Sequence, residues 1–151
     1  MVKAEIWIRK MELGDVHHVL EVERASFPTP WTTDIFYHEL TDNHHAHYYV
    51  VEWEKGIIGY AGMWVVIDEA QITNIAVLPD FRGKRIGEKL FQHMLFTAVS
   101  FGTERLSLEV RESNIVAQKM YQKFGLVPGG IRKNYYTDNQ EDAIVMWVNF
   151  K

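Results

Sequence analysis

The stretch QITNIAVLPDFRGKRIGEKLFQHMLFTAVSF, residues 71–101, decides the fold of this chain. Residues 71–78 are apolar and β-branched around Ile75, which predicts a strand. A basic loop containing Gly83 follows, and the amphipathic segment 86–101 predicts a long helix directly after the loop. A strand, a tight turn and a helix start together direct backbone N–H groups and the positive end of a helix dipole at one point. We therefore expect an anion-binding loop here.

The charges of this loop indicate what kind of anion to expect. Arg82, Lys84, Arg85 and Lys89 cluster here, although the chain as a whole has a net charge of −4. The expected ligand therefore carries phosphates. The loop has neither the Gly-Lys-Ser/Thr of a P-loop nor the G-x-G-x-x-G of a dinucleotide site. The alternative is an ordinary helix N-terminus with a solvated basic first turn.

Composition limits the other classes of function. The 151 residues, 47% of them hydrophobic, predict one domain, 1–151, with a sizeable core. Cysteine is absent, so a thiol nucleophile, a disulfide or a cysteine-bound zinc is excluded, and a cytoplasmic location fits. The acidic balance disfavours a nucleic-acid surface, and no apolar run reaches membrane-spanning length. His44, His45 and His47 lack a clear further ligand, so no metal is expected.

The periodicity predicts an α/β fold with a central mixed sheet, mostly antiparallel, of about seven strands flanked on both faces by about four helices. The expected strands are 4–10, 46–53, 57–67, 71–78, 105–111, 126–136 and 142–150. The expected helices are 16–26, 32–40, 85–101 and 114–124. Gly14 and Asp15 are expected to cap the first helix, and Thr32 or Thr33 the second. Gly102 and Gly125 are expected to end the third and fourth helices.

The strand 105–111 carries a carboxylate in its middle. Leu106, Leu108 and Val110 alternate with Ser107, Glu109 and Arg111, so Glu109 lies on the polar face. Strands disfavour glutamate, which makes this position unusual. Glu109 is either paired with a neighbouring base on a half-exposed strand or a general base beside the anion-binding loop.

Several blocks resemble one known family. The loop 82–87 resembles the Arg/Gln-x-x-Gly-x-Gly/Ala loop of the GNAT N-acetyltransferases, with Arg85 in place of the middle glycine. The segment LEVRESN, 108–114, continued by AQKMYQKFGL, 117–126, resembles the RimI-type group within that family, which acetylates the N-terminal alanine of ribosomal proteins. Two further blocks resemble the same group: FPTPWT, 27–32, and RKNYY, 132–136, the latter together with Glu141-Asp142-Ala143. The likeness covers essentially the whole chain.

This resemblance implies a GNAT fold, acetyl-CoA as co-substrate and a role for each matching residue. Glu109 would be the general base and Tyr121 the general acid. Trp31, Tyr135 and Tyr136 would contact the peptide. The cofactor contacts implied are Ile75, Ala76 and Val77 for the acetyl and pantetheine groups, Arg82, Gly83, Lys84, Arg85, Ile86, Gly87 and Glu88 for the pyrophosphate, and Asn114 for the pantetheine arm.

The implied roles agree with the chemistry of acetyl transfer. The acceptor amine arrives as ammonium and must lose a proton to a base. A backbone N–H near Val77 could stabilise the oxygen that gains negative charge, and the Tyr121 hydroxyl could protonate the departing thiolate. No nucleophilic side chain is needed, which agrees with the absence of cysteine. The alternatives are a core position for Tyr121, an N-cap for Asn114, and plain packing for Trp31, Tyr135 and Tyr136.

The sequence thus predicts transfer of acetyl to a protein N-terminal α-amine, and the resemblance points to the N-terminal alanine of a small-subunit ribosomal protein as partner. Acetylation of lysine side chains or of a small-molecule amine is the nearest alternative. A catalytically silent acyl-CoA-binding module would keep the loop but should lack the Glu109 and Tyr121 pair. A nucleotide-binding protein is disfavoured by the missing P-loop.

Overall fold

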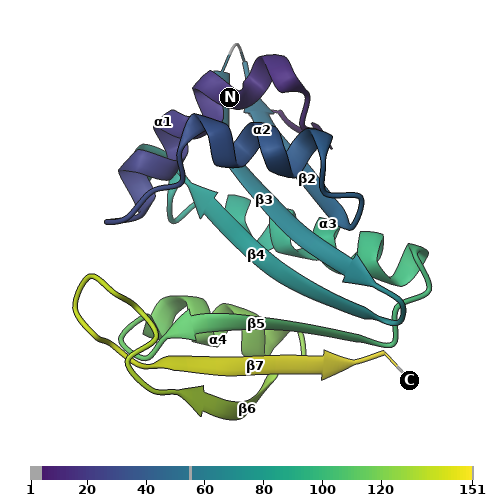
Figure 1. Ribbon diagram of the computed structural model, residues 1–151, viewed down its shortest axis with the longest axis vertical. Helices are drawn as coiled ribbons and strands as arrows, with labels where there is room; N and C mark the ends of the chain where they lie inside the picture. The colour runs from purple at the N-terminus through teal and green to yellow at the C-terminus, as the bar shows by residue number, and fades with distance from the viewer. Residues whose placement is uncertain (1–4, 55, 151) are drawn as a thin grey trace. The chain divides into compact units, whose positions relative to one another are not determined.

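The computed structural model describes residues 5–54 and 56–150 and has the predicted α/β architecture (Figure 1). Within these two ranges, one seven-stranded sheet has the order β1-β2-β3-β4-β5-β7-β6. It is mixed, because β4 and β5 are parallel while β1–β2, β2–β3, β5–β7 and β6–β7 are antiparallel. Its strands are β1 (Ile6–Lys10), β2 (Ala46–Trp53), β3 (Gly56–Val66), β4 (Glu69–Val77), β5 (Arg105–Arg111), β6 (Val127–Arg132) and β7 (Ala143–Asn149).

In the part of the chain that the structure describes, four α-helices accompany the sheet, as predicted: α1 (Val16–Ser26), α2 (Thr33–Thr41), α3 (Ile86–Ser100) and α4 (Ile115–Lys123). The chain divides into two compact units. Unit 1 comprises residues 1–64 and 73–94, and unit 2 comprises residues 65–72 and 95–151. The expectation of one domain, 1–151, stays a prediction.

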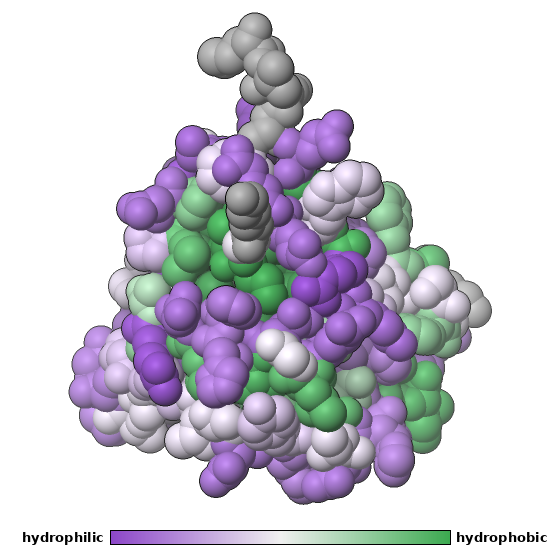
Figure 2. All heavy atoms as spheres, turned by 90° about the horizontal axis from the view of Figure 1, so that it is seen from above, coloured by the Kyte–Doolittle hydropathy of each residue, from purple (hydrophilic) through white to green (hydrophobic). Residues whose placement is uncertain are grey.

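Unit 1 is a set of strands with helices on both faces. Figure 1 shows α1 and α2 in front of β2 and β3, with α3 behind them. The core contains fully buried aromatic rings, and those of Phe36 and Tyr60 meet edge-on at 5.6 Å. On the other face the ring of Tyr49 packs on His93 of α3 at 4.8 Å. Hydrophilic side chains surround hydrophobic ones on the face shown in Figure 2.

The helix starts of unit 1 follow local side-chain chemistry. The Thr32 hydroxyl accepts a hydrogen bond from the N–H of Ile35 at 3.3 Å, which confirms the predicted cap of α2. Asp15 precedes α1 as predicted but does not cap it. Its carboxylate instead accepts from the N–H of Glu12 and from the Arg9 guanidinium, so it closes the 3₁₀ turn Leu13–Asp15. The hydrogen bonds from the Arg9 guanidinium hold the pKa of the Asp15 carboxyl below its usual value.

Unit 2 is an antiparallel group, β5–β7–β6, with α4 behind it in Figure 1. The alternation predicted for β5 is confirmed, because Leu106, Leu108 and Val110 are buried. Gly102 and Gly125 end their helices with φ of 80° and 93°, as expected of a C′ residue. The predicted strand 126–136 was too long. It ends at Arg132, because Asn134 adopts a φ of 52° and its N–H turns to the Asp142 carboxylate.

We expect Gly62→Ala to destabilise the fold by about 2 kcal/mol or more, the scale of overpacking a rigid core. A Cβ at Gly62 would lie 2.1 Å from the ring of Tyr48, which is buried and held at its hydroxyl by Glu39. Gly14→Ala is the matched control, since a Cβ there meets nothing within 4 Å. Urea denaturation measures both, and equal midpoints for the two variants would contradict the packing described.

Candidate active site

The predicted anion-binding loop lies in unit 1 between β4 and α3. The chain leaves β4 at Val77, makes the 3₁₀ turn Pro79–Phe81 and enters α3 at Ile86. Arg82 turns back toward the strand, with its Nε donating to the carbonyl of Val77 at 3.0 Å and its Nη2 to the hydroxyl of Ser26 at 3.3 Å. This side chain therefore fixes the end of β4 and the entry into the loop.

The backbone of the loop adopts the left-handed region twice. Gly83 has a φ of 78° and Arg85, where the family has glycine, a φ of 64°. The turn directs the chain into α3, whose first N–H groups have no partner within the helix itself. The side chains of Lys84 and Arg85 are exposed beside this helix start. The loop thus combines backbone donors and positive charge, as an anion site requires. Ile75, Ala76 and Val77 form the last residues of β4.

Glu109 lies in the middle of β5 in unit 2, and its side chain is only 11% exposed. Its carboxylate pairs with the Nε of Arg132 at 3.1 Å and accepts hydrogen bonds from the Nε2 of Gln71 at 3.3 and 3.2 Å. The alternative that Glu109 is paired with a neighbouring base is therefore confirmed. The same contacts orient the carboxylate, and they are compatible with a general base.

Tyr121 of α4 is 5% exposed. Burial, and to a lesser degree the nearby Tyr136, raises the pKa of its hydroxyl well above the usual value. The group therefore stays protonated at neutral pH and is a donor. Burial also raises the pKa of Tyr136 to about 12, with Glu109 among the charges that contribute. Electrostatic interactions thus link Tyr136 to both Glu109 and Tyr121 within unit 2.

The other predicted contacts have mixed outcomes. Asn114 is exposed, and its Oδ1 accepts from the N–H of Ala117 at 3.2 Å, so the N-cap reading is confirmed and a cofactor contact stays a prediction. Tyr135 is 46% exposed and meets Tyr136 edge-on at 5.1 Å. Trp31 is half-buried against the ring of Phe36 at 5.2 Å and also borders a pocket of unit 1.

A charged network in unit 2 holds the segment that carries these tyrosines. Arg111 contacts Asp138 at 2.9 Å and Glu141 at 3.2 Å, and its guanidinium lies 4.0 Å from the centre of the Tyr136 ring. Glu141 also accepts from the N–H of Ser113 at 2.7 Å. The hydrogen bonds from Ser113, followed by that from Arg111, lower the pKa of Glu141 to about 2, so this carboxylate is charged at neutral pH.

Sequence reasoning missed the partners of the candidate base. Gln71 and Arg132 were not singled out, although both lie in segments that carried other predictions. Within residues 5–54 and 56–150, no group of three or more His, Asp or Glu side chains is arranged to hold a metal ion. In the same part of the chain, no helix combines the length and hydrophobicity needed to cross a membrane.

Comparison with known proteins identifies the class. A model of the Acetyltransferase (GNAT) family matches residues 16–126, and the chain belongs to this family. The crystal structure of the ribosomal-protein-S18-alanine N-acetyltransferase from Escherichia coli superimposes with a TM-score of 0.89 at 30% identity, covering 97% of this chain and 95% of that one. The GNAT fold expected from the sequence is thereby confirmed.

The names of similar proteins are more specific than the family. A Bacillus subtilis protein, itself only provisionally named a [ribosomal protein bS18]-alanine N-acetyltransferase, is 54% identical over 97% of both chains. The [ribosomal protein bS18]-alanine N-acetyltransferase of Haemophilus influenzae is 35% identical over 92% of this chain and 95% of its own. A GNAT acetyltransferase of Elizabethkingia anophelis, solved with acetyl-CoA bound, shares the fold with a TM-score of 0.77 at 21% identity and covers 96% of this chain and 98% of its own.

Arg85→Gly should raise the free energy of unfolding by about 1 kcal/mol, because glycine adopts a φ of 64° without the steric cost that arginine bears. Calorimetric affinity for coenzyme A should fall less than about tenfold, since the backbone conformation is kept. Lys84→Gly, at the neighbouring exposed position, is the control for loss of one charge. A larger loss of affinity in Arg85→Gly alone would make the Arg85 side chain itself a ligand group.

Proposed function

We propose that this chain transfers the acetyl group of acetyl-CoA to the α-amine of a protein N-terminus, and that its substrate is the N-terminal alanine of a ribosomal protein of the bS18 kind. The observation that carries the proposal is the 54% identity over 97% of the chain to the Bacillus subtilis relative. A ribosomal-protein substrate would place the reaction in the cytoplasm.

The residues of the loop fit acetyl-CoA. Two residues with positive φ, a helix start and exposed basic side chains are suited to a pyrophosphate. When bound, acetyl-CoA supplies the activated acyl group. The residues proposed to hold it are Ile75, Ala76 and Val77, then Arg82, Gly83, Lys84, Arg85, Ile86, Gly87 and Glu88, with Asn114.

Glu109 is proposed to take the proton of the acceptor ammonium, directly or through one water. The amine nitrogen can attack the thioester carbonyl only after this proton has left. Arg132 and Gln71 both hold the carboxylate, so it does not need to reorganise before it acts. Tyr121, protonated at neutral pH, is proposed to donate its hydroxyl proton to the departing thiolate.

An α-amine suits this machinery better than a lysine side chain. Its reference pKa is about 7.7–8.0, against about 10.4 for lysine, so deprotonation at neutral pH costs roughly 3 kcal/mol less. A single carboxylate is a weak base and is matched to the easier task. Three aromatic side chains are proposed to contact the first residues of the peptide. They are Tyr135, which is half-exposed, and Tyr136 in unit 2, and Trp31 in unit 1.

Glu109→Gln should lower kcat about 10²-fold or more, the usual scale for loss of a general base, and flatten the acidic limb of the pH–rate profile. Tyr121→Phe should lower kcat with little change in affinity for acetyl-CoA. The matched controls are Glu112→Gln, an exposed carboxylate close in the chain, and Tyr37→Phe, an exposed phenol on α2. Wild-type kcat in both site variants, at unchanged thermal stability, would return Glu109 and Tyr121 to structural roles.

A competition between acceptors tests the proposed substrate class. An alanine-starting peptide with one internal lysine should be acetylated at its α-amine, and the same peptide with a blocked N-terminus should react at least about 10²-fold more slowly, given the difference between the two amine pKa values. Mass spectrometry with fragment mapping locates the acetyl group. Comparable acetylation of the blocked peptide at lysine would overturn the N-terminal assignment and leave the family membership intact.

A further inference from the structure

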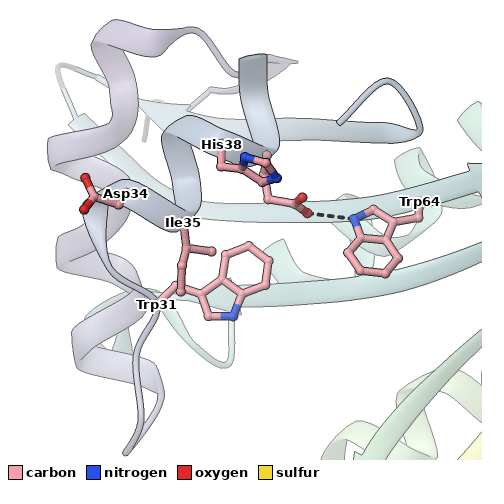
Figure 3. A pocket seen from close by; sticks show the side chains of 6 residues that line it. Trp31, Asp34, Ile35, His38 and Trp64 are labelled. Atoms are coloured by element: carbon pink, nitrogen blue, oxygen red, sulfur yellow. Dashed lines mark hydrogen bonds between the residues drawn. The ribbon is translucent and has the colours of Figure 1, made fainter. Parts of the chain in front are cut away.

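Unit 1 contains a pocket of about 380 Å³ that none of the roles above uses, apart from Trp31. It is lined by Trp31, Asp34, Ile35, His38, Glu39 and Trp64, which come from the segment before α2, from α2 itself and from β3. In Figure 3, Trp31 and Ile35 lie at one end, Trp64 at the other, and Asp34 points outward. Its walls are thus largely aromatic and aliphatic, and its acidic groups are the carboxylates of Asp34 and Glu39. The imidazole of the lining, His38, pairs with Asp42 at 3.0 Å.

The carboxylate of Glu39 forms the fixed polar part of this pocket. The side chain is 7% exposed, and its Oε1 accepts from the hydroxyl of Tyr48 at 2.8 Å and from the Nε1 of Trp64 at 2.7 Å. Among residues 5–54 and 56–150, its Oε2 accepts a hydrogen bond only from the Nδ2 of Asn43, at 2.8 Å. A carboxylate has about four acceptor positions, so Oε2 can take a further donor.

These three donors are neutral, so they position the carboxylate without cancelling its charge. Within the described ranges, Glu39 forms no ion pair with a lysine, arginine or histidine of the chain. A nearly buried carboxylate of this kind favours a cation among its ligands. Asp34, exposed at the outer side of the pocket, adds negative potential.

The two indoles add a second preference, for a flat cation. Trp31 is held by a tilted ring contact with Phe36 and an edge contact with Tyr48, the latter at 6.3 Å. Trp64 is held by its hydrogen bond to Glu39. Fixed indole faces bind cations, and a planar guanidinium both stacks on them and donates to a carboxylate. Ile35, 41% exposed, offers apolar surface to the aliphatic stem of such a side chain.

We propose that this pocket binds the side chain of an arginine in the acceptor peptide, downstream of the alanine whose amine is acetylated. The inference rests on the proposed function for the identity of the peptide and on the pocket for the arginine. It makes the enzyme selective for N-termini followed by a basic residue. Lysine binds more weakly, because an ammonium lacks the planar face that stacks on indole.

The first experiment measures binding without catalysis. N-acetylated alanine peptides, which carry no acceptor amine, place arginine at each of the first positions in turn, with citrulline, its uncharged isostere, as the comparison. Calorimetry with the full chain should show about tenfold tighter binding of arginine at one position, the scale of a partly desolvated cation–π and carboxylate contact. Equal affinity of arginine and citrulline at every position would overturn the proposal.

Variants assign the effect to the pocket. Glu39→Gln and Trp64→Leu should each reduce the preference for arginine to under about threefold, and Asp34→Asn should weaken it about twofold in a salt-dependent way. Glu21→Gln, which removes an exposed carboxylate of α1 outside the pocket, should keep it. Should Glu39→Gln or Trp64→Leu unfold, the citrulline comparison and Asp34→Asn still decide. A preference unchanged in every folded pocket variant, or tighter binding of spermidine than of the arginine peptide, would overturn the proposal.

The same peptides with free N-termini separate the two proposals. With the arginine peptide, KM should be about tenfold lower than with citrulline and kcat the same. Acetylation of both peptides with equal KM would remove the arginine pocket and leave the proposed function standing. A preference in binding without α-amine acetylation of either peptide would remove the proposed function and leave the pocket standing.

Discussion

A buried carboxylate, Glu23, is the constraint on which unit 1 depends. The side chain is 2% exposed and accepts hydrogen bonds from the hydroxyl of Tyr60 and, at 2.8 Å, from the N–H of Trp31. The Tyr60 oxygen in turn accepts from the Nδ2 of Asn74 at 3.0 Å. Burial raises the pKa of Glu23, so these donors must be supplied by the fold itself. The network joins α1 to β3, to β4 and to the segment before α2.

The positions of the functional residues of unit 1 follow from this network. Because Glu23 fixes the backbone of Trp31, the indole can pack on Phe36 and Tyr48 and face the pocket. Tyr48 then donates to Glu39, so two carboxylates that lack cationic partners among the described residues are held through neighbouring aromatic side chains. Asn74 directly precedes Ile75, so the same network also anchors the strand end proposed to hold the acyl group. Neutral donors hold both groups without the desolvation of a second charge.

The sequence predicted what local patterns determine and missed what strand pairing determines. The alternation of apolar and polar residues correctly predicted β5, and a capping residue and a glycine correctly predicted the two ends of α4. These signals can be read from sequence because they lie within a few residues of each other. The pairing of Glu109 with Arg132 depends on the register of β5 with β7 and of β7 with β6, which brings together residues far apart in the chain. The positive φ of Arg85 could not be read from the residue type. Glu39 did leave a signal, since it follows Phe36 by one turn on the apolar side of α2.

The ion pair of Glu109 with Arg132 has a consequence for the choice of acceptor. An ammonium that approaches the carboxylate must also approach a guanidinium whose side chain is 56% exposed. The positive charge of Arg132 beside the carboxylate disfavours the protonated amine. It therefore lowers the pKa of the amine, which assists the removal of the proton. This repulsion with Arg132 opposes the binding of amines that remain protonated at neutral pH. Lysine side chains have a reference pKa about 2.5 units above that of α-amines, so they remain protonated more fully. On the proposed function, Arg132 therefore orients the base and at the same time selects against lysine.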